Sequence, residues 1–382
     1  QNYRSTETIL EAANGLISRN AGRLGKNLWT EGERGDPITL YAGFNEQDEA
    51  RYIVEQAESW CDEGNPRRSV AILYRSNAQS RVLEEALLRE RIPYRIYGGQ
   101  RFYERLEIRN ALAYLRLAQA RRDDAALERV LNTPPRGIGN KTVEKLREVA
   151  RRDQAPLWEA IEVVRKQTLL PARALTALAN FQALIDDFAT SAETLSLDEF
   201  TEHVIEMSGL MNYHRSEKGE RGQARVENLQ ELVTATRLFE PEDESISPLQ
   251  AFLDSAALDA GEGQADPYED SIQMMTLHSA KGLEFPLVFM AGVEENLFPH
   301  QMSLEEPGRL EEERRLAYVG ITRAMQKLIV TYAENRRLHG SDMYNTPSRF
   351  IREIPGELIE EVRLNGSVSR PLGSLSHHSL NE

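Results

Sequence analysis

The sequence predicts an α/β protein whose parallel sheet is interrupted by an inserted all-helical subdomain. Short β-rich runs alternate with helical patterns over residues 5–97, and similar runs return over residues 272–332. This alternation is typical of a parallel sheet with crossover helices. Between the two stretches, residues 107–253 show almost only helical patterns. We therefore expect one sheet domain formed by two separate stretches of chain, with a helical domain inserted between them.

The first stretch predicts helices and strands in turn. Ser5 is the expected cap of a helix whose apolar face contains Ile9, Leu10, Ala13, Leu16 and Ile17. The pattern that follows predicts strands at residues 38–41, 70–74 and 94–97, and helices at residues 47–60 and 79–90.

The inserted segment begins where Gly98-Gly99 ends this alternation. Helical periodicity predicts helices at residues 108–117, 125–131, 142–151, 157–164, 172–189, 197–208 and 224–239. Residues 260–270 are rich in Gly and Asp and predict a loop. Strands are then expected at residues 272–277, 287–293 and 328–332, with a charged helix at residues 310–324. The expected domain limits are 1–98 with 271–365 for the sheet domain, 99–270 for the helical domain, and 366–382 for a Ser/Gly-rich linker or tail.

Composition argues against a membrane-spanning protein and against one stabilised by disulfides. No apolar run approaches the roughly 18 residues that a membrane span needs. Cys61 is the only cysteine among 382 residues, which excludes an internal disulfide framework and fits a reducing cytoplasm. The net charge of −15 argues only weakly against nucleic-acid binding, because a long chain can confine its basic residues to one channel. Asp48-Glu49 resembles an acidic Mg²⁺ box, but no apolar strand precedes it, so we predict a helix start and no metal site.

The segment TLHSAKGLEF, residues 276–285, follows a predicted strand. The strand would deliver Thr276 and His278 to its carboxyl end, where open α/β sheets bind ligands. Gly282 would allow close approach of the backbone to a ligand, and Glu284 could accept a hydrogen bond from a ribose hydroxyl. An ordinary loop with a solvated lysine explains the same residues about equally well.

Two further segments place arginines near helix ends. EEERRLAYVGITRA, residues 311–324, begins with a charge run typical of a solvated face, but Arg323 follows its apolar part and would emerge from the packed side. An arginine delivered by a rigid helix can neutralise charge on a transferring phosphoryl group. QNYRS, residues 1–5, places Tyr3 and Arg4 at the mouth of a helix. There they could stack on a base and reach a phosphate, although a surface loop is the simpler interpretation.

The segment PPRGIGNKT, residues 134–142, lies between two predicted helices. Gly137 and Gly139 could present backbone N–H groups and a helix N-terminus to a phosphate, with Arg136 and Lys141 on either side. A plain helix-turn-helix with glycine as the C-cap is the alternative.

The segment AILYRSNAQSR, residues 71–81, ends a buried strand in polar side chains. Arg75 and Asn77 would lie on the carboxyl edge of the sheet, where a ligand can reach them. Ser76-Asn77 also fits a helix N-cap, and both interpretations can hold together.

Together these segments resemble the later motifs of the superfamily-one DNA helicases, in the UvrD/Rep/PcrA group. The four motifs QNYRS, YRSNAQSR, TLHSAKGLEF and EEERRLAYVGITRA occur in that family's order, and the resemblance covers nearly the whole chain, including PPRGIG. It implies a RecA-like second motor domain, interrupted by a mobile helical subdomain that meets duplex DNA. It also implies ATP with Mg²⁺ as cofactor. Single-stranded DNA, its junctions with duplex and possible repair proteins are the implied partners.

The resemblance implies nucleotide-binding roles for four residues. Tyr3 would stack on the adenine, and Glu284 would bind the ribose beside Gly282. Arg4 would contact the γ-phosphate, and Arg323 would act as the second arginine finger.

The resemblance implies DNA-binding roles for a second set. The residues that would line the single-strand path are Arg75, Asn77, Thr276 and His278. The turn that would grip duplex DNA is Gly137-Ile138-Gly139, with Arg136 and Lys141 beside it.

The phosphate loop of this family has no match in the sequence. That loop reads GxxxxGK[ST], whereas Gly25-Lys26 is followed by Asn27, and Asn20 stands where the first glycine belongs. We therefore expect the C-terminal half of an ATP-dependent 3′-to-5′ DNA helicase, inactive as a fragment, whose phosphate loop and Mg²⁺ ligands precede this sequence. The alternative is a free-standing DNA- or partner-binding module that has lost its motor half. We expect it in the bacterial cytoplasm, with the nucleoid.

Overall fold

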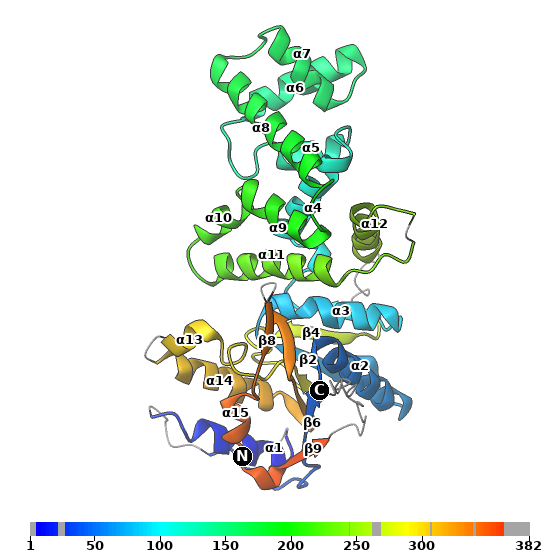
Figure 1. The fold of residues 1–382 in the computed structure, drawn as a ribbon. Helices are drawn as coiled ribbons and strands as arrows, with labels where there is room; N and C mark the ends of the chain where they lie inside the picture. Colours follow the sequence, from blue (N-terminus) through cyan, green and yellow to red (C-terminus); the bar gives the residue numbers. More distant parts are fainter. Residues whose placement is uncertain are drawn as a thin grey trace, which may run out of the picture.

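A computed structural model describes residues 5–21, 27–243, 245–261, 269–305, 308–338 and 341–362 of the chain. The molecule is elongated, with a sheet domain at one end and a stack of helices at the other (Figure 1). Each part has its own hydrophobic core, which is the property that defines a domain. The polypeptide crosses between the two parts after residue 96 and returns before residue 272.

A seven-stranded sheet forms the centre of the first domain, in the order β3-β4-β2-β5-β6-β1-β9. Every neighbouring pair in it is parallel, so the predicted α/β class is confirmed. All five residues of the central β2 are buried, as expected for a strand covered on both faces. The strands are β1 (Ile38–Gly43), β2 (Val70–Tyr74), β3 (Tyr94–Ile96), β4 (Ile272–Thr276), β5 (Phe285–Met290), β6 (Ala324–Ala333) and β9 (Ile359–Val362).

Helices cover both faces of this sheet. One core lies under α1 (Glu7–Ile17) and α14 (Arg309–Ile321), and the other lies under α2 (Glu46–Asp62) and α3 (Ser80–Arg89). The short helices α13 (Gln301–Glu305) and α15 (Arg349–Arg352) complete the domain. Among the described residues, 3-10 turns lie at Arg67–Ser69, Asn77–Gln79, Phe102–Glu104 and Gly356–Leu358.

The helical domain stacks its helices away from the sheet, so that α6 and α7 are farthest from it and α11 is close to it (Figure 1). A single apolar core runs through it, with Tyr114, Phe181 and Phe188 fully buried. Its helices are α4 (Leu106–Gln119), α5 (Asp124–Val130), α6 (Asn140–Asp153), α7 (Leu157–Lys166), α8 (Ala172–Ser191), α9 (Leu197–Met207), α10 (Leu210–Arg215), α11 (Glu220–Leu238) and α12 (Pro248–Gly261).

An antiparallel hairpin of β7 (Asn335–Leu338) and β8 (Ser341–Tyr344) rises from the sheet domain toward α11 (Figure 1). A buried ion group anchors its base. The guanidinium of Arg336 donates to Glu294 at 2.6 Å and also to Glu49, and all three residues are buried. Asp48 and Glu49 lie in the first turn of α2, as predicted.

Several local expectations are wrong. Ser5 does not cap α1, because Thr6 occupies the cap position and the Ser5 hydroxyl donates instead to the Ala324 carbonyl at 2.7 Å. The helix predicted up to residue 324 ends at Ile321, so Arg323 lies in the turn before β6. The loop predicted from residue 260 begins later, because α12 extends to Gly261.

The tail predicted from residue 366 lies outside the described residues. Within the described part of the chain, no helix is both long enough and apolar enough to cross a membrane.

Candidate functional site

A cavity of about 910 Å³ opens at the carboxyl edge of the sheet, between the sheet domain and the α10–α11 segment. Four residues assigned to the single-strand path come together in its lining, from the ends of β2 and β4. These residues are Arg75, Asn77, Thr276 and His278. The carboxyl ends of parallel strands meet at one edge of a sheet, which is why segments about 200 positions apart converge here.

Arg75 is held within this lining by an ion pair. Its Nε and Nη2 groups donate to the Glu313 carboxylate of α14 at 2.8–3.0 Å. The pKa of His278 is lowered, first by burial and then by the positive charge of Arg75. Thr276 contacts the Ser279 hydroxyl at 3.1 Å, which fixes the turn that presents His278. The lining therefore offers a clamped cation and a neutral imidazole.

The predicted cap at Ser76 is confirmed. The Ser76 hydroxyl accepts from Ala78 N, and the Gln79 side chain accepts from Ser76 N at 2.8 Å. This capping box orients the polypeptide between β2 and α3, so the backbone at Asn77 is well defined.

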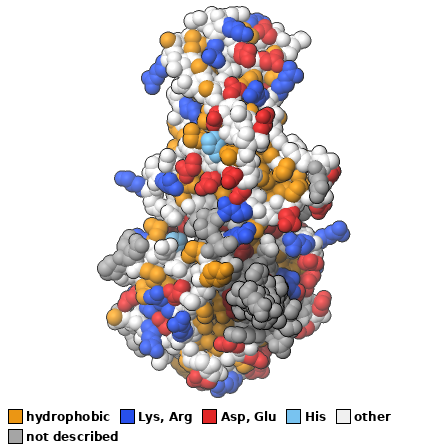
Figure 2. Space-filling model, in the orientation of Figure 1, with side chains coloured by type: hydrophobic (Ala, Val, Ile, Leu, Met, Phe, Trp, Pro, Cys, Tyr) orange, Lys and Arg blue, Asp and Glu red, His pale blue; other side chains and the backbone are white. Residues whose placement is uncertain are grey.

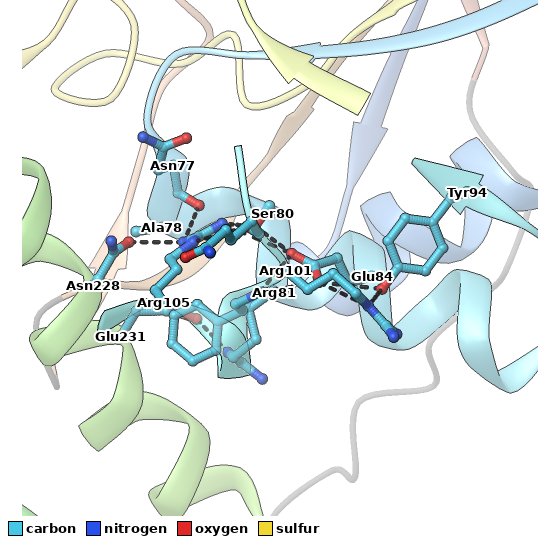
Figure 3. A network of polar contacts seen from close by, with 12 residues as sticks. Asn77, Ala78, Ser80, Arg81, Glu84, Tyr94, Arg101, Arg105, Asn228 and Glu231 are labelled. Carbon is cyan, nitrogen blue, oxygen red and sulfur yellow. Dashed lines mark hydrogen bonds and ion pairs between the residues drawn. The ribbon is translucent and has the colours of Figure 1, made fainter. Parts of the chain in front are cut away.

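A network of buried polar groups joins this edge of the sheet to α11 (Figure 3). Arg105 donates to Asn228 Oδ1 and to the Asn77 carbonyl, both at 2.9 Å. Arg81 donates from Nε to Glu231 at 2.7 Å, and burial raises the pKa of that carboxyl group. These bonds connect α3 and the start of α4 to α11 beside the cavity.

A third contact lies beside the network. Burial alone would raise the pKa of Glu227 on α11, but hydrogen bonds from His300 and Ser76 outweigh it and lower that pKa. These contacts connect α11 to two loops at the carboxyl edge of the sheet. No local pattern in the sequence indicates them.

The residues assigned to the nucleotide lie at the opposite, amino edge of the sheet. Glu284 directly precedes β5, and Arg323 directly precedes β6. The Arg323 Nη1 group donates to the Leu283 carbonyl at 2.9 Å, which brings the two loops together. Gly282 has φ +89°, and no atom lies within 4 Å of the position that a Cβ would occupy. A ligand can therefore approach this backbone closely.

Tyr3 and Arg4 lie outside the described residues. Ser5, which follows them in the chain, is anchored at the same amino edge through its bond to Ala324. Thr276 and His278 lie at the carboxyl end of β4, as predicted from the sequence. The structure places the rest of the segment TLHSAKGLEF at the opposite edge, with Gly282 and Glu284 just before β5.

The turn at residues 137–139 connects α5 to α6. Gly139 is the N-cap of α6 and Gly137 has φ +79°, so the backbone there faces open space rather than packed side chains. The alternative interpretation, glycine as a helix C-cap, is wrong, because Leu131 caps α5 well before the turn. Lys141 is exposed in the first turn of α6.

Arg136 does not lie beside the open face of this turn. Its guanidinium donates to the carbonyls of Val130, Pro134 and Ser208 at 2.7–3.2 Å. It also lies over the ring of Tyr114 at 5.6 Å. The predicted phosphate contact does not match this placement, because the side chain supports the turn from inside.

An exposed cation that the sequence did not suggest also lies close to the turn. The position of a Cβ on Gly137 would be 3.9 Å from the guanidinium of Arg173, which is in the first turn of α8. No local signal could have identified Arg173, because it is distant from Gly137 in the sequence. Over the face seen in Figure 2, acidic and basic side chains are interspersed. Binding of phosphates therefore depends on individual basic side chains, such as Arg173, and not on a broad basic surface on this face.

Comparisons with known proteins identify the family of the chain. The sequence profile described as "UvrD-like helicase C-terminal domain" matches residues 1–335. The chain is 60% identical over 374 residues to "DNA helicase II" of Escherichia coli, covering 97% of this chain and 52% of that protein. It is 43% identical over 369 residues to "ATP-dependent DNA helicase PcrA" of Bacillus subtilis, covering 95% and 50% respectively. The chain thus spans about half the length of these relatives. By these matches it belongs to the UvrD-like helicase C-terminal domain family.

Proposed function

We propose that the chain is the C-terminal half of an ATP-dependent DNA helicase that moves 3′-to-5′ along a single strand. The observation that carries this proposal is the separation of two residue sets across one sheet. Arg75, Thr276 and His278 line the cavity at the carboxyl edge, whereas Glu284 and Arg323 lie at the amino edge. Because the sheet between the two sites is rigid, a movement at one edge displaces the other edge with it.

The amino edge fits a nucleotide. Backbone approach is open at Gly282, the Glu284 carboxylate is exposed, and Arg323 lies beside the same loop. When bound, ATP supplies the free energy of hydrolysis. In this proposal Glu284 accepts a hydrogen bond from the ribose, and Arg323 holds positive charge where the γ-phosphate lies. Tyr3 and Arg4 would add base stacking and a second phosphate contact.

Among the described residues, no three His, Cys, Asp or Glu side chains are grouped so that they could hold a metal ion. In the proposal, Mg²⁺ and the phosphate loop belong to a first motor domain that faces the amino edge.

The carboxyl edge fits a single strand of DNA. In this proposal, Arg75 contacts a phosphate, and Asn77, Thr276 and His278 line the path of the strand. The turn at Gly137 and Gly139, with Lys141 and Arg173, holds duplex at the junction. Arg136 has a supporting role. We place this activity with chromosomal DNA in the bacterial cytoplasm, together with repair proteins.

The test is salt-dependent binding of the purified chain to a duplex with a 3′ single-stranded tail. Each phosphate contact contributes about −0.9 to the log–log slope on duplex and about −0.7 on single strand. We expect a slope worth several contacts, a preference for the junction, and no ATP hydrolysis above background. Binding without junction preference would favour a free-standing binding module. Absence of binding would show that the chain cannot form its DNA path alone, and DNA-stimulated hydrolysis by the pure chain would overturn the assignment as a motor half.

A further inference from the structure

A groove of about 730 Å³ lies between α7 and α8, within the helical domain that extends away from the sheet (Figure 1). None of the described residues that line it also lines the cavity at the carboxyl edge of the sheet. None of them belongs to the turn at residues 137–139. The α7–α8 groove is therefore separate from both DNA sites of the proposed function.

One wall of this groove is apolar. Leu175, Ala179 and Ala183 line it from α8, and their spacing of four residues places them on one face of that helix. Trp158 of α7 adds a largely buried indole ring, which lies 5.5 Å from the guanidinium of Arg121. The two alanines leave room beside the leucine, so an apolar side chain of a ligand can pack there.

The positive charge of the groove is available to a ligand mainly at Arg165. Two other lining cations are already paired with lining carboxylates, because Arg121 lies 2.7 Å from Asp186 and Lys166 lies 3.7 Å from Glu162. Within the described part of the chain, Arg165 has no carboxylate partner, and its Nη1 group donates to an uncharged amide instead. A ligand carboxylate can therefore pair with this guanidinium without displacing an existing ion pair.

That amide belongs to Gln182, which offers a second donor beside Arg165. The Gln182 Oε1 atom accepts from Arg165 Nη1 at 2.5 Å. Because arginine has donors only, this bond fixes which end of the amide is the oxygen, and the Nε2 group points elsewhere. The Gln182 side chain is only 5% exposed, and its Nε2 group has no hydrogen-bond partner among the described residues. A largely buried donor without a partner is costly, so an acceptor in the groove would be stabilised there.

We propose that the α7–α8 groove binds an acidic peptide segment of a partner protein. A carboxylate of the segment accepts from Arg165 and Gln182, and a neighbouring apolar side chain packs on Leu175, Ala179 and Ala183. Duplex DNA matches the groove less well, because its outer surface offers phosphates but no apolar side chain for this wall. The inference goes beyond the proposed function and does not depend on it, since the groove shares no residue with the two DNA sites.

The experiment is fluorine NMR of the purified chain labelled with fluorotryptophan. The chain has three tryptophans, of which Trp158 lines the groove, so Trp29 and Trp60 are internal controls. The probe is a short peptide that repeats Leu-Glu-Glu-Leu, which places a carboxylate and a leucine on one face in a strand or a helix. We expect the Trp158 signal to shift and saturate while the other two signals stay in place. The matched peptide that repeats Leu-Gln-Gln-Leu should bind about 10-fold more weakly, the effect of losing a hydrogen bond to a charged group.

Two variants test the proposed carboxylate subsite. Arg165→Gln and Gln182→Met should each weaken binding of the acidic peptide about 10-fold, because each removes a donor to the carboxylate. Arg152→Gln is the matched control, since this arginine is exposed on α6 outside the groove, and it should leave affinity unchanged. Unaltered Trp29 and Trp60 signals show that each variant is folded.

The contrary results are distinct from one another. An unchanged Trp158 signal with the acidic peptide would overturn the proposal and leave the proposed helicase function untouched. Equal affinities for the two peptides, or for the unaltered chain and Arg165→Gln, would leave no carboxylate subsite and also overturn it. The same shift with inorganic phosphate or with duplex DNA would assign the groove to anions or to the duplex contact. A shift on raising the protein concentration alone would assign it to a second copy of the chain, and either assignment overturns the acidic peptide.

Discussion

Arg75 and Glu313 form a two-pronged ion pair that joins the end of β2 to α14 across 238 positions of sequence. The Glu313 side chain is only 4% exposed and that of Arg75 17%. Among the described residues, Arg75 Nη1 has no hydrogen-bond partner. One edge of the guanidinium is therefore clamped while the other remains available to a ligand in the cavity.

The first prediction concerns this clamp. Arg75→Ala and Glu313→Ala should each lower the free energy of unfolding by about 2–4 kcal/mol, because each leaves a largely buried charge unpaired. The double variant should cost less than the sum, with a coupling of about 1–3 kcal/mol in urea unfolding. The exposed pair Arg315–Glu312 on the same helix is the control, with coupling below about 0.5 kcal/mol. If the double variant loses as much free energy of unfolding as the two single variants together, the ion pair does not hold Arg75 in place.

The second prediction separates two arginines near the turn before α6. Arg136→Ala should lower the free energy of unfolding by about 2–4 kcal/mol, because three carbonyls lose their donor. Arg173→Ala should change it by less than about 0.5 kcal/mol, since the side chain is exposed. The same Arg173 variant should flatten the salt slope for duplex DNA by about 0.9. Unchanged slopes for Arg173→Ala would remove it from the duplex contact.

The third prediction uses the two glycines of that turn. Gly139→Ala should cost less than about 1 kcal/mol of stability, because φ is −87° and no atom lies within 4 Å of the new Cβ. It should still weaken binding at the junction while sparing single-strand affinity, because the methyl group blocks close approach of the backbone.

Gly137→Ala should lower the free energy of unfolding more than Gly139→Ala does. Alanine at φ +79° carries about 1–2 kcal/mol of backbone strain, and it does so even when no DNA is bound. Gly64→Ala is its control, with φ +93° and open space in the sheet domain, so it should carry the strain without the binding defect. An equal loss of single-strand affinity in Gly139→Ala would show that the turn is not specific to duplex.

The sequence predicted the periodic elements well and the long-range contacts poorly. Strand β2 was predictable because a buried parallel strand is a continuous apolar run. Strand β9 has an exposed, acidic pattern and is ordered by pairing with β1, which no local signal reveals. Arg136 was expected beside the phosphate and instead donates to three carbonyls, and Arg173 near the same turn was not predicted at all, for the same reason. A cation beside glycine looks like a phosphate ligand until its carbonyl partners are known.

The fourth prediction is a pH dependence. The pKa of His278 is lowered from 6.5 by burial and by Arg75, against smaller opposing effects of Glu220 and Glu313. Without DNA, stability should decrease as pH falls below about 6.5, because the unfolded chain takes up this proton more readily. A DNA phosphate favours the imidazolium, so single-strand affinity should rise over the same range.

The measurement is the salt slope at pH 7.5 and pH 5.5, which should steepen by about 0.7 at the lower pH if one contact is gained. His278→Asn should abolish the change, whereas His203→Asn, on the surface of the helical domain, should not. The same steepening in His278→Asn would assign the proton to another group.

The last prediction concerns Arg323, tested in a protein that contains both motor domains. Arg323→Ala should reduce ATP hydrolysis by about 10³-fold or more, the usual effect of losing an arginine finger. DNA affinity should change little, because Arg323 lies at the amino edge and does not line the cavity at the carboxyl edge. Its bonds to the Val319 and Leu283 carbonyls also connect α14 to the loop before β5, so thermal unfolding must be measured alongside. Arg323→Lys keeps the charge without the planar fork, and should recover stability more than turnover. If hydrolysis and DNA affinity fall together in proportion to lost stability, Arg323 connects the two loops and senses no phosphate.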